Sequence, residues 1–160
     1  MVLWHAGLAL AIVWNVFRDP AIDHRLVVAG ALAPDAVDLI WGRRAAAHTL
    51  MAPVVVLSLV MLATRGRRLL RRRLLALPIG MFLHLVLDAT WTETDLMWWP
   101  LAGWEFPAGR LVPAFPLVLA LEIVGAWAVG WFVWRFALDR AEPRRYFLRS
   151  GRLRPDVQRP

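Results

Sequence analysis

Five predominantly apolar stretches make up most of this chain, and clusters of arginine lie beside them. The stretches are residues 2–17, 26–41, 49–63, 74–91 and 114–138. A helix that faces water carries charged or polar residues along one side, and these stretches carry almost none. The pattern predicts an all-α, polytopic membrane protein with about five transmembrane helices. Because some stretches are short for a bilayer of ~30 Å, the first two can instead form a tilted or re-entrant pair.

The distribution of charge predicts how the chain lies in the membrane. All 19 basic residues are arginines, the formal charge is +7, and most arginines flank apolar stretches. This is the arrangement of topology determinants, so no nucleic-acid partner is expected. With the loop 65–73 in the cytoplasm, sixteen arginines lie inside and three outside. We therefore predict a multi-pass protein of the cell membrane with its N-terminus outside and its C-terminus in the cytoplasm.

Two regions follow from this topology. Residues 1–138 form the predicted helical transmembrane domain, and residues 139–160 form a basic cytoplasmic tail that we expect to be interfacial or disordered.

The pair His84 and Asp88 lies inside the fourth apolar stretch. Residues four apart share one face of a helix, about one turn from each other. An ionisable pair in apolar surroundings is costly unless it binds something, and an imidazole with a carboxylate is half of a zinc site. The alternative is a structural pair that forms a hydrogen bond within a helix bundle.

Other ionisable residues fall in the same outer layer when the arginines alone set the orientation. His5 lies about one turn from the outer end of the first stretch, Asp35 and Asp38 share a face, and His48 begins the third stretch. The chain has no cysteine, so His, Asp or Glu must bind any metal. The six predicted metal ligands are His5, Asp35, Asp38, His48, His84 and Asp88.

The two aspartates are expected to differ in role. Asp35 directly follows Pro34, whose ring bends the helix and turns the next carboxylate toward the bundle axis. We predict Asp35 as a direct ligand, and Asp38 as a ligand of a second metal or as the residue that orients a liganding histidine. Either aspartate can alternatively cap the helix that restarts after the proline.

Further residues are candidates for the chemistry around the metal. Asp38 and Glu122 are the predicted proton acceptors, because a carboxylate at membrane depth without a metal is available for that role. Glu122 can instead pack against an arginine. The predicted ligands of an anionic head group are the three outer arginines Arg43, Arg44 and Arg110.

Three segments carry a family resemblance. The runs GALAPDAVD at 30–38, HT at 48–49 and GMFLHLVLD at 80–88 resemble the YdjM-like family of membrane-bound metal-dependent hydrolases. That family shows G-x-L-x-P-D-x-D, a T-H-S and an H-x-x-x-D ahead of a Trp-Pro pair like Trp99-Pro100. The resemblance covers about residues 1–100. It departs at Arg43, where the family often has a histidine, and at Ala45, where it has a glycine.

A more distant similarity is to the zinc-dependent phospholipases C and single-strand nucleases. Trp4-His5, the aspartates of 35–38, His48, and His84 with Asp88 follow the order of the zinc ligands in those all-helical enzymes. A second H-x-x-x-D and a further histidine are absent here. The resemblance therefore implies one or two metal ions, with zinc as the expected metal.

These observations predict a metal-dependent hydrolase. Its expected substrate is a phosphoester or similar ester of a lipid-associated molecule at the outer face of the membrane. The expected partners are membrane lipids and their anionic head groups. Two alternatives stay open: a metal or proton transporter that uses the same polar layer, and a non-catalytic membrane interaction protein.

Overall fold

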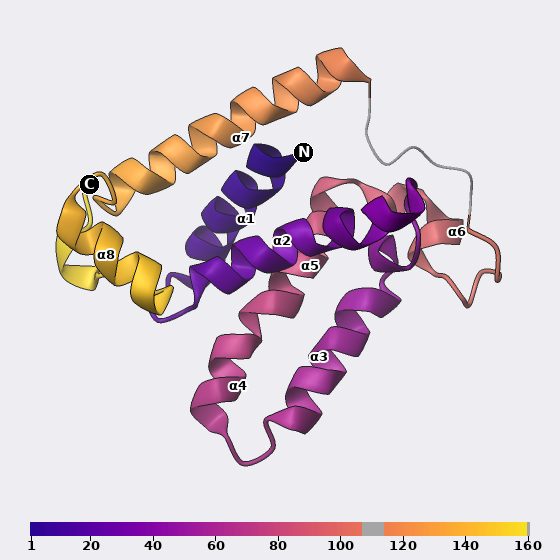
Figure 1. The fold of residues 1–160 in the computed structure, drawn as a ribbon, viewed down its shortest axis with the longest axis horizontal. Coiled ribbons are helices and arrows are strands. Elements are labelled where there is room, and N and C mark those ends of the chain that lie inside the picture. Colours follow the sequence, from indigo (N-terminus) through magenta and orange to yellow (C-terminus); the bar gives the residue numbers. More distant parts are fainter. Residues whose placement is uncertain (107–113, 160) are drawn as a thin grey trace.

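The computed structural model describes residues 1–106 and 114–159, which form helices and no strand (Figure 1). This confirms the all-α prediction. The longer helices are α1 (Val2–Phe17), α2 (His24–Asp38), α3 (Met51–Ala63), α5 (Ala76–Leu87), α7 (Phe115–Arg135) and α8 (Ala141–Ser150). The short elements are α4 (Arg68–Leu74), α6 (Thr94–Met97) and the 3₁₀ turns η1 (Leu39–Trp41), η2 (Ala46–His48), η3 (Thr90–Thr92) and η4 (Pro155–Val157).

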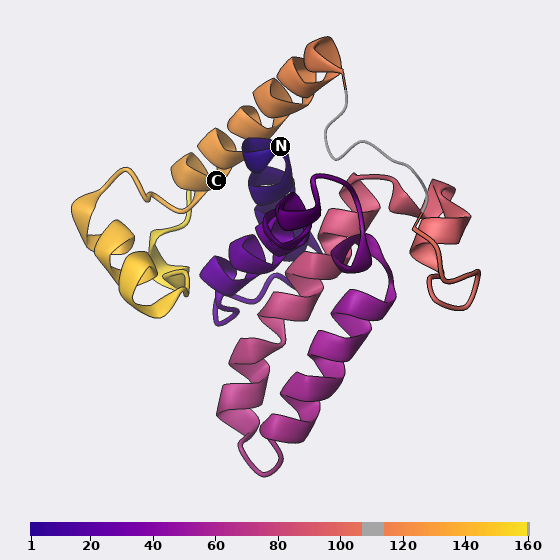
Figure 2. The same cartoon turned by 45° about the vertical axis from the view of Figure 1, so that its right-hand side comes forward.

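Helix α2 is the centre of the packing. It contacts α5 along much of its length and also contacts α1, which in turn packs along α7. Helix α3 runs antiparallel to α4 and α5, and the three form a long hairpin that extends from the rest of the molecule (Figures 1 and 2). The start of the chain therefore lies between α2 and α7.

Glycines allow the two closest helix crossings. A Cβ atom at Gly30 of α2 or at Gly80 of α5 would overlap a backbone carbonyl of the other helix. Gly7 of α1 and Gly125 of α7 make the same kind of contact. Small residues that let helix backbones touch are typical of helix packing in membranes. The crossing of α2 and α5 brings the polar residues of those two helices next to each other.

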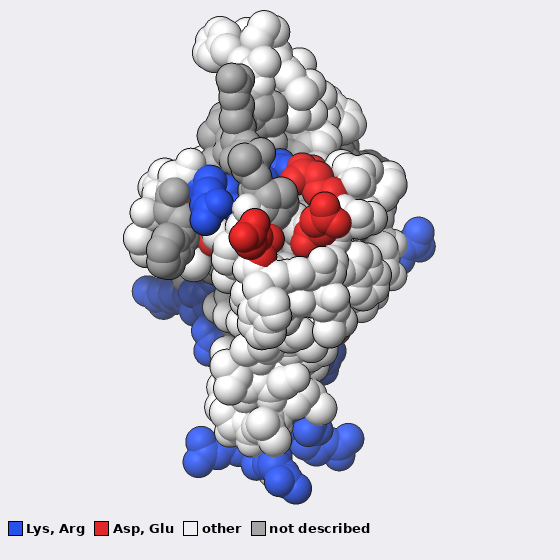
Figure 3. All heavy atoms as spheres, turned by 90° about the vertical axis from the view of Figure 1, so that its right-hand side faces the viewer, with Lys and Arg blue, Asp and Glu red and all other residues white. Residues whose placement is uncertain are grey.

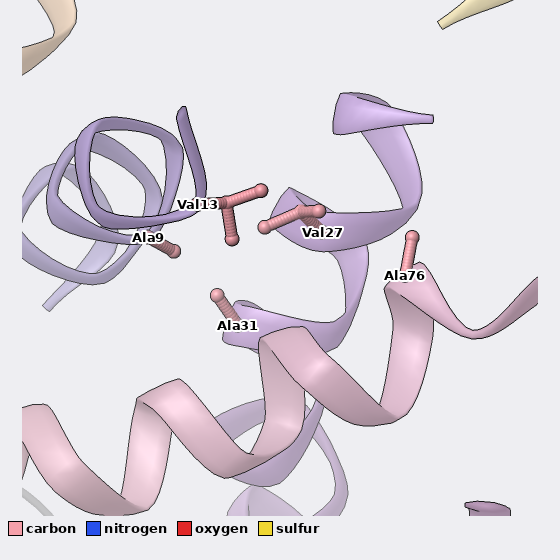
Figure 4. Packing of buried hydrophobic residues seen from close by; sticks show 5 residues of the cluster. All are labelled: Ala9, Val13, Val27, Ala31 and Ala76. Atoms are coloured by element: carbon pink, nitrogen blue, oxygen red, sulfur yellow. The ribbon is translucent and has the colours of Figure 1, made fainter. Parts of the chain in front are cut away.

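Small apolar side chains fill the space between α1, α2 and α5. Figure 4 shows that they point toward one another from the three helices. Alanine and valine keep the helices close because they occupy little volume between the axes. The buried cluster consists of Ala9, Val13, Val27, Ala31 and Ala76.

The region predicted as a basic tail packs on the helices through α8 and the residues after it. Leu153 is buried in a second apolar cluster with Leu10, Phe132 and Phe136. The carbonyl of Gly151 accepts a hydrogen bond of 2.8 Å from the backbone N–H of His24, at the start of α2.

Asp23 connects three parts of the chain at this end of the molecule. Its carboxylate caps the start of α2, is paired with Arg25 at 3.2 Å, and is paired with Arg73 of α4 at 2.8 Å. Burial raises the pKa of Asp23, but the hydrogen bonds from the two arginines outweigh it and hold the pKa below its ordinary value.

The structure does not support five membrane spans or a multi-pass location. Among the described helices, α7 alone is long and apolar enough to cross a membrane. The predicted span 26–41 ends as an α-helix at Asp38, and the span 74–91 contains the last residue of α4, the whole of α5, which ends at Leu87, and the start of η3. Hydropathy measures composition, and here backbone turns end the helices inside apolar stretches, as at Ala89 with φ of 53°.

Many of the arginines lie at the tip of the hairpin, away from the polar groups where α2 and α5 cross (Figure 3). Figure 3 shows basic side chains at the tip of the hairpin formed by α3 and α4, with acidic side chains higher on the same face. Other basic side chains lie at the height of the acidic ones, so the tip of the hairpin is the part of this face where basic side chains gather without acidic ones (Figure 3).

Candidate metal centre

Three helices and one 3₁₀ turn bring all six predicted ligands into one network of contacts. Four of them each offer a ligand atom, and these four atoms lie within 4.8 Å of one another. The four are Asp35, His48, His84 and Asp88. His5 from α1 and Asp38 from α2 contact members of this group directly.

Asp38 fixes the orientation of His48. The Nδ1–H of His48 donates to Oδ2 of Asp38 at 2.7 Å. The same carboxylate accepts hydrogen bonds from the backbone N–H groups of Ala45 and Ala47, at 2.6 and 3.2 Å. Asp38 is fully buried, so the chain before η2 wraps around one carboxylate. As a result the Nε2 atom of His48 points into the cluster.

The backbone of α2 fixes His84 in the same way. The Nδ1–H of His84 donates to the carbonyl of Ala31 at 2.7 Å. Its Nε2 atom lies 3.2 Å from Nε2 of His48. Because each ring carries its proton on Nδ1, both Nε2 atoms present lone pairs to each other. Two such atoms repel at this distance unless a proton or a cation lies between them.

Two carboxylate oxygens complete the group. Oδ1 of Asp35 lies 3.4 Å from Nε2 of His48 and 3.7 Å from Nε2 of His84. Oδ2 of Asp88 lies 3.7 Å from both nitrogen atoms. Ligands of a tetrahedral zinc ion, at ~2.0–2.1 Å from the metal, lie about 3.3 Å from one another. The four atoms, all within 4.8 Å of one another, could therefore hold a metal ion.

His5 lies on the other side of the two carboxylates. Its Nε2 is 2.9 Å from Oδ1 of Asp88, and its Nδ1 is 3.7 Å from Oδ2 of Asp35. The ring stacks on His84 with centroids 3.9 Å apart, and its buried Nδ1 has no hydrogen-bond partner. Each carboxylate thus turns one oxygen to the two histidines and the other to His5.

Asp35 gives the cluster its contact with the surroundings. Its side chain is 25% exposed, whereas those of His5, His48, His84 and Asp88 are 1% exposed or less. Asp35 is therefore the one of these side chains that meets the surroundings, and its Oδ2 lies 3.4 Å from the N-terminal ammonium of Met1.

Arg44 is held inside the site. Its guanidinium pairs with Oδ2 of Asp88 at 2.8 Å and with Glu93 at 2.5 Å, and its side chain is only 10% exposed. In this position Arg44 neutralises and orients Asp88, where the sequence predicted a head-group ligand. Arg43 is exposed and lies over the ring of Phe106. Arg110, the third predicted head-group ligand, lies outside the described residues.

Glu122 lies at the start of α1. Its Oε2 accepts a hydrogen bond of 2.8 Å from the backbone N–H of Leu3, one of the unpaired N–H groups of the first helical turn. Among the contacts of the described residues, Glu122 meets this backbone and none of the six ligands. This contact makes Glu122 a helix-capping residue, whereas the sequence predicted a proton acceptor.

The charge state of His48 reflects its neighbours. Burial lowers the pKa of this histidine, but the hydrogen bonds with Asp35 and Asp38 outweigh burial and raise the pKa above its ordinary value. A proton on Nε2 would relieve the repulsion between the two histidines. A metal ion has to displace that proton.

Sequence reasoning missed two partners of the centre. Glu93 and the carbonyl of Ala31 orient Arg44 and His84, yet neither was a candidate. Backbone carbonyls give no signal in a sequence. Glu93 did give a signal in the sequence, because it is an acidic residue five positions after Asp88 in a tryptophan-rich segment.

Comparison of the chain with protein-family models, with curated proteins and with solved structures finds no match.

Proposed function

We propose that the protein is a membrane-bound, metal-dependent hydrolase with zinc as its metal. The observation that carries the proposal is the convergence of four acceptor atoms on one point. Both histidines are held by their Nδ1 atoms so that their Nε2 lone pairs face each other at 3.2 Å. Such a group is unfavourable unless a proton or a cation lies among these atoms, and four of them within 4.8 Å of one another could hold a metal ion.

The residues would divide the work as follows. Asp35, His48, His84 and Asp88 would bind the metal, with Asp38 and Arg44 holding two of these ligands in position. A zinc ion held there would polarise an ester or phosphoryl oxygen and lower the pKa of water to ~7. His5 would bind a second ion together with Oδ2 of Asp35 and Oδ1 of Asp88. Alternatively, it would accept a proton at its unpartnered Nδ1.

Two contacts change the roles that the sequence predicted for proton transfer. Asp38 already accepts three hydrogen bonds and is buried, so it is poorly suited to receive a proton. Glu122 binds the backbone of α1. We therefore favour His5 as the proton acceptor when a single metal is bound.

The substrate is proposed to be a phosphoester or similar ester of a lipid-linked molecule. The apolar composition and the exposed apolar helix α7 favour a location in the cell membrane. We retain several short or tilted spans as a proposal, with the cluster toward the outer face and the arginine-rich hairpin in the cytoplasm. The resemblance to the YdjM-like family of membrane-bound metal-dependent hydrolases favours the same conclusion.

A transporter would need polar groups that continue from the cluster through the molecule. Ala31, whose carbonyl binds His84, belongs to the apolar cluster with Val27 and Ala76. Among the described residues, this apolar packing ends the group of polar side chains on the side of α2 that faces α1 and α5. It favours the hydrolase over transport.

Metal analysis of the detergent-purified protein tests the proposal. We expect one or two zinc ions per chain, lost in His48→Ala and in His84→Ala. His24→Ala is the matched control, because His24 is equally buried but lies outside the cluster. Full zinc content in both cluster variants would refute the metal centre.

The reaction requires a second measurement. The zinc-loaded protein should hydrolyse bis(p-nitrophenyl) phosphate or a lipid phosphoester, and His84→Ala should not. Zinc uptake into proteoliposomes without hydrolysis of any ester would show that the centre serves transport.

A further inference from the structure

Helices α1, α3 and α5 enclose an apolar groove of about 430 Å³ on the face of α5 opposite the metal centre. Phe82 and His84 lie two positions apart on this helix, about 200° around its axis, so they face different ways. The lining side chains are all apolar. They come from residues 12, 13, 16 and 17 of α1, from residues 50, 53, 54 and 57 at α3, and from residues 75, 78, 79, 82 and 83 at α5.

Two arginines flank the end of the groove nearest the arginine-rich hairpin. Arg18 directly follows Phe17, which lines this end. Arg71 precedes Leu75 by one helical turn, and the Leu75 N–H donates to the Arg71 carbonyl at 3.0 Å. Residues at this spacing share a helix face, so Arg71 lies below Leu75 at the groove's end.

These two arginines differ from their neighbours in their ion pairs. Arg72 is paired with Asp19 at 2.6 Å and Arg73 with Asp23 at 2.8 Å. Among the described residues, no carboxylate lies within 4.0 Å of the side chains of Arg18 or Arg71. Positive charge is therefore uncompensated at the one end of the groove where it meets the hairpin.

We propose that this groove binds an acyl chain of an anionic phospholipid, with the phosphate between Arg18 and Arg71. The groove is within the ~300–1,000 Å³ of common ligand sites. It runs about 12 Å along α5 from Leu75 to Leu83, at ~1.5 Å per residue. A peptide would bring backbone N–H and C=O groups into a groove that offers them no polar partner.

The site rests on the membrane location proposed above but not on the metal centre. Its lipid comes from the cytoplasmic leaflet, whereas the proposed substrate meets the cluster at the outer face. Absence of lipid binding with full zinc content would therefore refute the lipid site alone. Lipid binding without zinc would refute the metal centre alone.

Native mass spectrometry of the detergent-purified full chain tests the proposal. The probes are phosphatidylglycerol and phosphatidylcholine with the same acyl chains, and inorganic phosphate. We expect one phosphatidylglycerol per chain, held about 30-fold more tightly than phosphatidylcholine, since each arginine near the head group is worth ~1 kcal/mol. The double variant Arg18→Gln/Arg71→Gln should lose this preference, and Leu57→Trp should block both lipids by filling the groove.

Matched variants control for charge and for size. Arg65→Gln/Arg67→Gln removes the same charge from the turn between α3 and α4, and Leu59→Trp adds the same ring to an exposed position of α3 outside the groove. Both should bind phosphatidylglycerol like the parent protein. The proposal is overturned if either control loses as much binding as its partner variant. Equal binding of the two lipids by the parent protein, or competition by inorganic phosphate alone, would also overturn it. Zinc content and thermal unfolding show that each variant is folded.

Discussion

Replacing Asp38 by asparagine tests whether this aspartate orients the ligand His48 or is itself a metal ligand. The aspartate accepts three hydrogen bonds, at 2.6 Å from Ala45 N, 3.2 Å from Ala47 N and 2.7 Å from His48 Nδ1. An asparagine of the same shape has one acceptor oxygen. If that oxygen keeps the two short contacts, the amide NH₂ faces the N–H of Ala47, and two donors meet.

The expected cost follows from these contacts. One hydrogen bond to a charged group is worth ~1.5–3 kcal/mol, and the remaining two lose the help of the negative charge. A partner that orients a metal-binding histidine typically contributes ~10–100-fold to metal affinity, or about 1.4–2.8 kcal/mol. Both routes give the same range. We expect Asp38→Asn to weaken zinc binding ~10–100-fold and to leave its stoichiometry unchanged.

Isothermal titration with zinc provides the comparison. Asp35→Asn should abolish binding, because it replaces a ligand oxygen that lies 3.4 Å from Nε2 of His48. Asp95→Asn, at an exposed aspartate of α6, should bind zinc like the parent protein. If Asp38→Asn weakens zinc binding more than Asp35→Asn does, Asp38 is the direct ligand and the roles assigned to the two aspartates are wrong. Thermal unfolding without added metal shows whether each variant is folded.

Three further predictions concern packing, pH and topology. Gly80→Val should force α2 and α5 apart, lower the stability of the fold by ~1–3 kcal/mol or more, and lower the zinc content. Gly130→Val should change neither stability nor zinc content, because no other atom lies within 4 Å of its added Cβ. Thermal unfolding and metal analysis measure the two effects. The pKa of Asp23 is lowered from 3.8 in the folded protein, so its ion pairs stabilise the fold at pH values above 3.8. This stabilisation is lost as the pH falls through the lower pKa of the folded state. Asp23→Asn should therefore make the midpoint of thermal unfolding less dependent on pH in the acid range. A reporter fused after Gly151 should report cytoplasm and one near Gly103 the outside; the opposite result at both sites would reverse the proposed orientation.

The meeting of six polar residues was predictable because two independent signals agreed. The arginines predicted which end of each apolar stretch faces the same side, and helical spacing predicted which polar residues share a face. His5 and His48 belong to segments far apart in sequence, yet both meet Asp88 in the structure.

Helix ends and the partners of single side chains were not predictable in this way. The apolar stretch that begins at residue 74 contains the break between α4 and α5, and hydropathy does not report backbone hydrogen bonds. Arg44 was counted as a surface charge, but the chain turns at Gly42, with φ of 63°, and carries it inward to Asp88. Glu122 is bound to α1 because α7 packs there, and no local pattern specifies which helix is its neighbour.

The hydrogen bond between His24 and Gly151 has a consequence for how the molecule is made. All six residues of the candidate centre precede residue 89, whereas the carbonyl that accepts from the first N–H of α2 belongs to residue 151. At the usual rate of synthesis, ~5–20 residues per second, the second event follows the first by roughly 3–13 s. On the function proposed above, the emerging chain would be able to bind its metal before the Gly151 carbonyl pairs with the N–H of His24 at the start of α2. During that interval the ion would hold α1, α2 and α5 together until α7 and α8 arrive.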